Sequence, residues 1–156
     1  MMEKSTITVP TVLNYNFSSI FLDYGKVSVR NVDFNPAGKF DEICGYADVP
    51  NPDYPAELLV HFPFSPPGDY WLLDTDYENF ASVYACTDVL GLLKIEFAWI
   101  LVRDPYAVSF DTMNSALSAF KAQNLTTANF LPVSNEGCTF ENPSGGDPCT
   151  GGNWGK

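Results

Sequence analysis

The stretch Tyr70–Cys86 constrains the fold of this chain more than any other part of the sequence. An apolar run begins at Tyr70, the polar residues Asp74 to Asn79 interrupt it, and it resumes from Phe80. Two short apolar runs separated by a polar turn predict a β-hairpin. A hairpin alone does not identify a function.

Further strands are predicted on both sides of this hairpin. The stretch Asp48–Pro55 is a loop, because its three prolines cannot donate ladder hydrogen bonds. Between Ser109 and Gln123 the apolar residues change to helical spacing, which predicts one helix capped by Ser109 or Asp111. The predicted strands are Thr8–Phe17, Lys26–Phe34, Phe40–Ala47, Leu58–Phe64, Leu93–Arg103 and, after the helix, Thr126–Leu131.

The strand Leu93–Arg103 has the clearest inward face. Its odd positions are apolar as far as Leu101, whereas Lys94 and Glu96 occupy the other side. Because side chains alternate across a strand, Trp99 and Leu101 are predicted to face the interior.

Length and charge limit the possible functions. The 156 residues suffice for one domain with one core. The formal net charge of -11 makes nucleic acid or an anionic membrane surface an unfavourable partner. No apolar run approaches the roughly 18 residues that cross a bilayer, so no transmembrane segment is predicted.

Few residues offer catalytic or metal chemistry. His61 is the only histidine, so a centre with two imidazoles cannot form, and we expect a structural or solvent-facing side chain. Asp74, Asp76 and Glu78 lack the glycine and terminal glutamate of an EF-hand, which favours a role in the turn. The sequence therefore indicates no catalytic residues, no metal site and no enzyme.

Two stretches together resemble the lipocalin family. Thr75-Asp76-Tyr77 is similar to its second signature motif and Phe97–Pro105 (FAWILVRDP) to its third, and the hairpin resembles the apolipoprotein D-like and bilin-binding branch. The resemblance implies an all-β fold, an antiparallel up-and-down barrel with one C-terminal α-helix packed outside. Residues 1–137 are expected to form the lipocalin domain and residues 138–156 a Cys- and Gly-rich tail.

The family's first strand, with its Gly-x-Trp motif, has no counterpart in this sequence. The resemblance therefore implies an incomplete barrel of about seven of the usual eight strands. In the family that tryptophan stacks on the arginine of the third motif, here Arg103, so this stack is expected to be missing. A shorter form of the fold and a truncated sequence both account for the difference.

The resemblance also implies a function, the binding and transport of one small hydrophobic ligand. The guest would be a bilin, retinoid, carotenoid, fatty acid or steroid, with no required cofactor; biliverdin or a carotenoid would be a bound pigment. Two structural interpretations stay open as alternatives to ligand binding: Tyr15 as an ordinary aromatic residue of the barrel wall, and Asn31 as an amide at the end of a strand. The ligand-binding residues implied are Tyr15, Asn31, Phe62, Tyr70, Trp99 and Leu101.

Four cysteines, Cys44, Cys86, Cys138 and Cys149, suit two disulfides in a secreted domain and allow three pairings. The resemblance implies partners for Cys86 and Cys138 that this chain lacks. A local Cys138–Cys149 bond is therefore expected, with Cys44 and Cys86 reduced or mispaired.

The compartment implied by the family is extracellular. Asn16 and Asn124 begin glycosylation sequons, which favour a secreted glycoprotein. The first residues nevertheless lack the apolar core of a secretory signal, so no signal peptide is predicted in this chain.

Two alternative functions stay open. One lipocalin branch isomerises a lipid with a cavity cysteine, and Cys44 is the only conceivable nucleophile here, although no general base lies near it in sequence. The open sheet edges left by a missing first strand would instead suit a homo-oligomeric assembly or coloration protein.

Overall fold

Six β-strands follow one another along the chain, and each pairs antiparallel with the next. The computed structural model describes residues 26–34, 40–89, 91 and 93–133, without the side chains of residues 32–34, 40 and 41. The strand order β1-β2-β3-β4-β5-β6 confirms the predicted up-and-down topology. The elements are β1 (Lys26–Phe34), β2 (Phe40–Asp48), β3 (Glu57–His61), β4 (Gly68–Thr75), β5 (Phe80–Val89), β6 (Leu93–Val102) and α1 (Phe110–Ala122).

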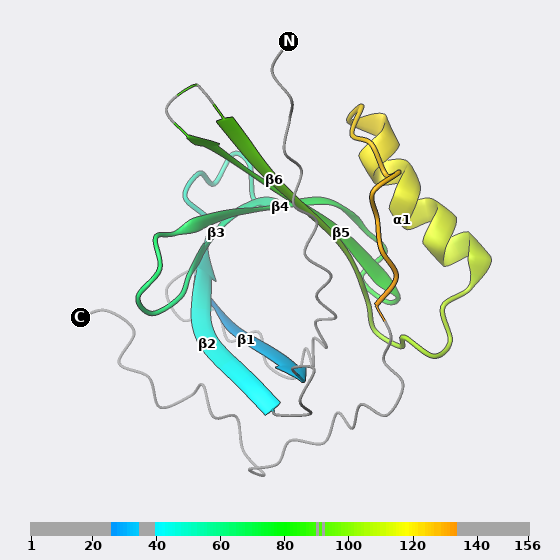
Figure 1. The fold of residues 1–156 in the computed structure, drawn as a ribbon, viewed down its shortest axis with the longest axis horizontal. Helices are drawn as coiled ribbons and strands as arrows, with labels where there is room; N and C mark the ends of the chain where they lie inside the picture. Colours follow the sequence, from blue (N-terminus) through cyan, green and yellow to red (C-terminus); the bar gives the residue numbers. More distant parts are fainter. Residues whose placement is uncertain (1–25, 35–39, 90, 92, 134–156) are drawn as a thin grey trace.

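The sheet is curled, and α1 lies outside it on the convex face, against β5 and β4 (Figure 1). Alternate side chains of each strand point to the concave and convex faces, and residues paired across two strands share a face. Val83 pairs with Trp99 on the concave face, whereas Ser82 Oγ donates a hydrogen bond to the Ala116 carbonyl of α1 on the convex face. The middle of β5 is therefore buried on both sides.

The β4–β5 turn is built around the side chain of Asp76. Its Oδ1 accepts backbone N–H bonds from Glu78, Asn79 and Phe80 at 3.1, 2.7 and 3.0 Å, and its Oδ2 accepts from Asn79 Nδ2 at 2.7 Å. Tyr77 adopts a φ of 63°, in the left-handed region, as the chain reverses. These bonds, the backbone N–H of Asn79 first, hold the pKa of Asp76 well below its usual range.

The helix α1 begins and ends where the sequence predicts. Ser109 is its N-cap, and Ser109 Oγ accepts the N–H of Thr112 at 3.0 Å. Gln123 is its C-cap, and Asn124, with a φ of 56°, follows in the left-handed conformation that commonly ends helices. The side chain of Phe120 is fully buried, so the apolar stripe of α1 is core packing.

Two strand predictions need correction. Residues 126–131 form an irregular segment with a turn, in which the Phe130 N–H donates to the Thr127 carbonyl at 3.2 Å. Phe130 packs edge-on against Phe120, with ring centroids 5.0 Å apart, so this segment buries an aromatic ring beside the helix instead of pairing with a strand. β3 ends at His61, before Pro63, because proline cannot donate to a ladder. The predicted strand Thr8–Phe17 lies outside the described residues.

Replacement of Ser82 tests how the helix is held to the sheet. Ser82→Ala should lower the free energy of unfolding by about 1–2 kcal/mol, because it removes a buried 2.8 Å hydrogen bond between β5 and α1. Ser118 is a matched control, since its Oγ donates to the Ser115 carbonyl on the exposed side of α1. Ser118→Ala should change stability by less than about 0.5 kcal/mol in urea unfolding followed by circular dichroism. Equal losses in the two variants would contradict this assignment.

Acid should weaken the β4–β5 turn through Asp76. Because its folded pKa is depressed, Asp76 stabilises the fold at neutral pH, and this contribution is lost as the pH falls below about 4. Asp76→Asn cannot titrate at this position, so the difference in unfolding free energy between parent and variant should be largest near neutrality and shrink in acid. Denaturant unfolding at several pH values measures this difference, and a gap independent of pH would contradict the prediction.

Candidate functional site on the concave face

The concave face of the sheet carries a continuous apolar surface. Val83 and Leu101 are buried together, and Tyr70, Leu72 and Trp99 pack against them. A second cluster spans β1, β2 and β3, and Tyr70 packs against it as well, so the two clusters are joined. The members of this second cluster are Val29, Ala47 and Val60, with Val27, Leu58, Phe62 and Tyr70 packed around them.

Three aromatic rings stand in a row on this face. The rings of Phe97 and Trp99 are stacked, with centroids 5.7 Å apart and an interplanar angle of 2°. The ring of Tyr70 lies 6.3 Å from that of Trp99 at 19°. Tyr70 comes from β4 and the other two from β6, so the row crosses β5 and forms a wall of nearly parallel rings.

Four of the ligand-binding residues predicted from the resemblance pack against the two concave clusters: Phe62, Tyr70, Trp99 and Leu101. Asn31 lies on the same face, two residues beyond Val29 in β1. Its Oδ1 is shielded from solvent, and no hydrogen-bond partner for it is found within the part of the chain that the structure describes. Tyr15 lies outside the described residues.

Leu72 and Val83 belong to the same wall, although they were not predicted from the sequence as ligand-binding residues. Leu72 pairs with Val83, and Val83 pairs with Trp99, so the three share a face. An inward Trp99 does not by itself identify them, because the residue of β5 that pairs with Trp99 depends on the β5–β6 register.

Phe62 can lie on the concave face because Gly45 has no side chain. A Cβ at Gly45 would stand 2.2 Å from the His61 carbonyl oxygen and 2.6 Å from Phe62 Cδ1. Both distances are far below a normal contact, so this glycine permits the close approach of β3 to β2.

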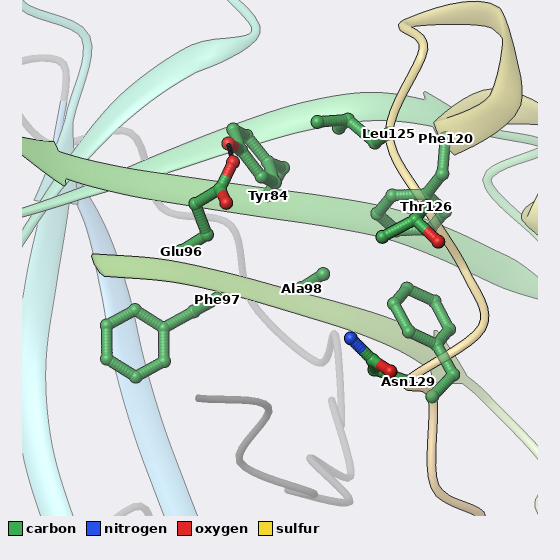
Figure 2. A pocket seen from close by; sticks show the side chains of 9 residues that line it. Tyr84, Glu96, Phe97, Ala98, Phe120, Leu125, Thr126 and Asn129 are labelled. Atoms are coloured by element: carbon green, nitrogen blue, oxygen red, sulfur yellow. Dashed lines mark hydrogen bonds between the residues drawn. The ribbon is translucent and has the colours of Figure 1, made fainter. Parts of the chain in front are cut away.

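A small hollow lies on the convex face, between β5–β6 and the segment after α1 (Figure 2). Its lining includes Tyr84, Glu96, Phe120 and Asn129. Tyr84 Oη donates to Glu96 Oε1 at 2.6 Å, and burial followed by this bond raises the pKa of Tyr84 above its ordinary value. The sequence placed Glu96 away from the interior but did not indicate this pair, which needs the β5–β6 register to be known.

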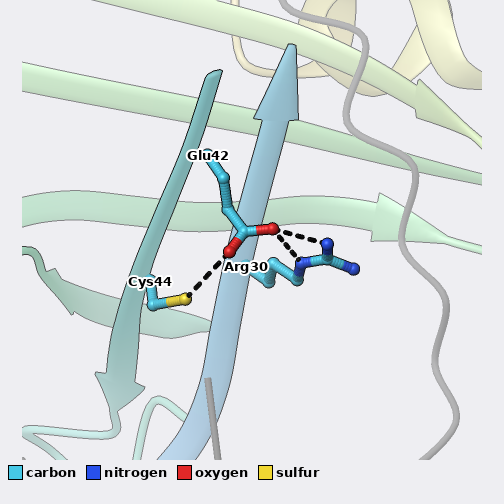
Figure 3. A network of polar contacts seen from close by, with 3 residues as sticks. All are labelled: Arg30, Glu42 and Cys44. Carbon is cyan, nitrogen blue, oxygen red and sulfur yellow. Dashed lines mark hydrogen bonds and ion pairs between the residues drawn. The ribbon is translucent and has the colours of Figure 1, made fainter. Parts of the chain in front are cut away.

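Arg30, Glu42 and Cys44 form a contact network on the convex face of β1 and β2 (Figure 3). Arg30 Nε and Nη2 donate to Glu42 Oε2 at 2.8 and 2.5 Å, and Cys44 Sγ lies 3.9 Å from Glu42 Oε1. Cys44 and Cys86 were expected to be reduced or mispaired. Cys44 is disulfide-bonded, which excludes the reduced state for it, and Cys86 is free. The expected Cys138–Cys149 bond lies outside the described residues.

The disulfide also removes the basis of the isomerase hypothesis. That hypothesis needs a Cys44 thiolate inside the cavity. The Cys44 sulfur is instead part of a disulfide and faces away from the concave wall.

His61 makes structural contacts on the convex face. Its ring stacks on Tyr46 with centroids 4.4 Å apart, and its Nε2 lies 3.3 Å from Asp48 Oδ2. Lys26 Nζ stands 4.2 Å from the centroid of the same Tyr46 ring.

Among the described residues, no three His, Cys, Asp or Glu side chains are grouped so as to hold a metal ion. The described helix, α1, is not long and apolar enough to cross a membrane.

Arg103 fastens the end of β6 to the β4–β5 turn. Its Nη2 donates to the Tyr77 carbonyl at 2.8 Å, and its backbone N–H donates to the Asn79 carbonyl at 3.0 Å. The two stretches that carry the family resemblance therefore contact each other directly. The guanidinium is anchored here on a carbonyl oxygen, a contact that the sequence did not predict.

Comparison with protein families supports what the motifs and the topology indicate. Residues 47–136 match the model of the lipocalin / cytosolic fatty-acid binding protein family. The chain belongs to this family. In this lipocalin the match begins in β2 and continues beyond α1, so it includes both signature stretches.

Apolipoprotein D sequences are similar to this lipocalin over part of their length. The protein from Mus musculus is 43% identical over 86 residues, which are 54% of this chain and 46% of the mouse protein. The protein from Macaca fascicularis is 34% identical over 115 residues, or 73% of this chain and 60% of the macaque protein. The lipocalin thus spans about half the length of the relatives it matches.

Solved structures of lobster proteins share the fold. Apocrustacyanin A1 aligns with a TM-score of 0.57 at 23% identity, covering 66% of this chain and 56% of that one. H1 crustacyanin from Homarus americanus aligns with a TM-score of 0.58 at 24% identity, covering 67% and 57%. At such identities the similarity establishes an all-β lipocalin fold with a C-terminal helix, and it does not identify a ligand.

Two glycines allow a test of the packing beneath Phe62. Gly45→Ala should destabilise the protein by about 1–3 kcal/mol, because the new methyl group would collide with the His61 carbonyl and the Phe62 ring. Gly68→Ala is the control, since a Cβ at Gly68 meets nothing within 4 Å and should change stability by less than about 0.5 kcal/mol. Thermal unfolding of both variants measures the difference. A harmless Gly45→Ala substitution would show that β2 and β3 do not approach as closely as described.

Proposed function

We propose that this lipocalin binds and carries one small hydrophobic molecule against the concave face of its sheet. The observation that carries the proposal is the row of near-parallel rings, which Tyr70 joins to both apolar clusters. The ligand contacts are assigned to Tyr15, Asn31, Phe62, Tyr70, Trp99 and Leu101.

Burial of apolar ligand surface supplies the affinity in this proposal. A ligand that buries roughly 300 Å² gains about 7 kcal/mol at 25 cal/mol per Å². Part of this gain is offset by the lost motion of the ligand. The strands on either side fix the three rings before binding, so little further ordering is needed when the ligand arrives.

The family resemblance indicates the range of ligands and the setting. Bilins, retinoids, carotenoids, fatty acids and steroids fall within this range, and a bound biliverdin or carotenoid would make the protein a pigment carrier. We propose a secreted, non-enzymatic protein, in keeping with the exposed sequon residue Asn124 after α1 and with the disulfide at Cys44.

Assembly into a homo-oligomer is the second candidate function. Within the described residues β1 and β6 are the edge strands of the sheet, and β6 offers ten residues of backbone along its outer side. Edge strands can pair with another chain. Oligomers formed in the absence of any hydrophobic ligand would favour this candidate over simple transport.

Fluorescence of two tryptophans on opposite faces tests ligand binding at the concave face. Dibrominated octadecanol, whose bromines quench only at short range, should quench the fluorescence of Trp99. The quenching should saturate when one ligand molecule is bound per protein molecule. Trp99→Phe should remove most of this quenching and weaken binding several-fold, because it reduces the aromatic wall.

Trp71 provides the matched control. It pairs with Tyr84 on the convex face, and the two ring centroids are 6.0 Å apart. Trp71→Phe should therefore leave the quenching and the affinity nearly unchanged. Loss of quenching in the Trp71 variant but not in the Trp99 variant would place the ligand on the convex face and contradict the proposal.

A further inference from the structure

The cations whose side chains the structure describes lie away from the row of aromatic rings on the concave face. Of the eight Lys and Arg residues in the sequence, Lys4, Lys39 and Lys156 lie outside the described residues, which leaves five. Lys26 and Arg30 contact Tyr46 and Glu42 on the convex face, and Lys94 shares that face with Glu96. Lys121 is exposed on α1.

Arg103 is the fifth of these cations, and it stands past the end of the wall. It follows β6, beyond the buried Leu101, and its guanidinium donates to the Tyr77 carbonyl in the β4–β5 turn. A carboxylate held beside Phe97, Trp99 and Tyr70 would therefore have apolar side chains as its neighbours.

The carboxylate-bearing positions of β3 to β6 also belong to the convex face. Glu57 pairs with Trp71, and Asp74 with Ser82, which bonds α1. With a formal net charge of -11 for the whole chain, the protein's own field adds to the cost of bringing a second negative charge to this wall.

We infer that the concave face selects uncharged ligands, an extended apolar molecule with a hydroxyl or carbonyl group rather than a carboxylate. The inference rests on the proposed function and narrows its ligand class. Burial of an ionised carboxylate among apolar side chains is costly, so an acid of the same shape binds mainly in its protonated form. The shielded amide of Asn31 offers a neutral polar partner to a hydroxyl group.

Two ligands that differ only in their head group test this selection. Dibrominated octadecanol and dibrominated octadecanoate carry the same chain and the same bromines, and both are followed by quenching of Trp99. At about pH 7.5 the acid should bind at least about tenfold more weakly than the alcohol, because most of it is ionised. As the pH is lowered towards about 5, the affinity for the acid should rise by up to about tenfold per pH unit, while that for the alcohol stays constant.

Two lysine substitutions separate the charge of the wall from the charge of the protein. Asn31→Lys places an ammonium group on the concave face and should strengthen binding of the acid at about pH 7.5 by about tenfold or more. Ser28→Lys adds the same charge in the same strand, but Ser28 pairs with Tyr46 on the convex face, so it should leave the preference for the alcohol unchanged.

The outcomes distinguish the selection from the binding itself. Equal affinities for alcohol and acid at about pH 7.5, with no response to Asn31→Lys, would overturn the selection while the proposed function stands. Tight binding of the acid that is lost in Arg103→Gln would overturn it too, and would place the carboxylate at the β4–β5 turn. Quenching by neither ligand in a folded sample would overturn the proposed function, and with it the selection.

Discussion

Burial of β5 on both of its faces is the constraint on which the rest of the structure depends. Val83 and Ser82 are both completely shielded from solvent, although neighbouring side chains of a strand point in opposite directions. One side of β5 therefore needs α1 as a cover, and the other needs the side chains of β4 and β6. The helix covers the convex side of β5, and the aromatic row and the rest of the concave apolar wall cover its other side.

The order of elements and the direction of most side chains could be predicted from the sequence. Period two in Leu93–Arg103 placed Trp99 and Leu101 on the inner side, and helical spacing with a Ser109 cap gave α1 to within a residue. Both patterns are local, so no knowledge of distant contacts was needed. The family resemblance supplied the up-and-down topology, which strand patterns by themselves leave open.

Contacts between distant segments were the part that the sequence could not provide. Thr126–Leu131 was predicted as a strand, but the place of the Phe130 ring is set by its contact with Phe120 on the helix. The Tyr84–Glu96 bond likewise depends on where two separate strands meet. The residues of the candidate site divide in the same way, into those predictable from a single strand and those that depend on contacts between strands. The rings of β4 and β6 were predictable one strand at a time, whereas the row that they form across β5 needed the register.

Gly45 has a consequence for how β2 can align with β3. Only three residue pairs join these strands, Tyr46–His61, Ala47–Val60 and Asp48–Leu59, so the ladder itself specifies its register weakly. A slip by one residue would bring Cys44 or Tyr46 beneath the Phe62 ring, where even a single Cβ does not fit. Because only glycine fits at this position, Gly45 excludes the shifted pairings of β2 with β3 that a short ladder would otherwise allow during folding.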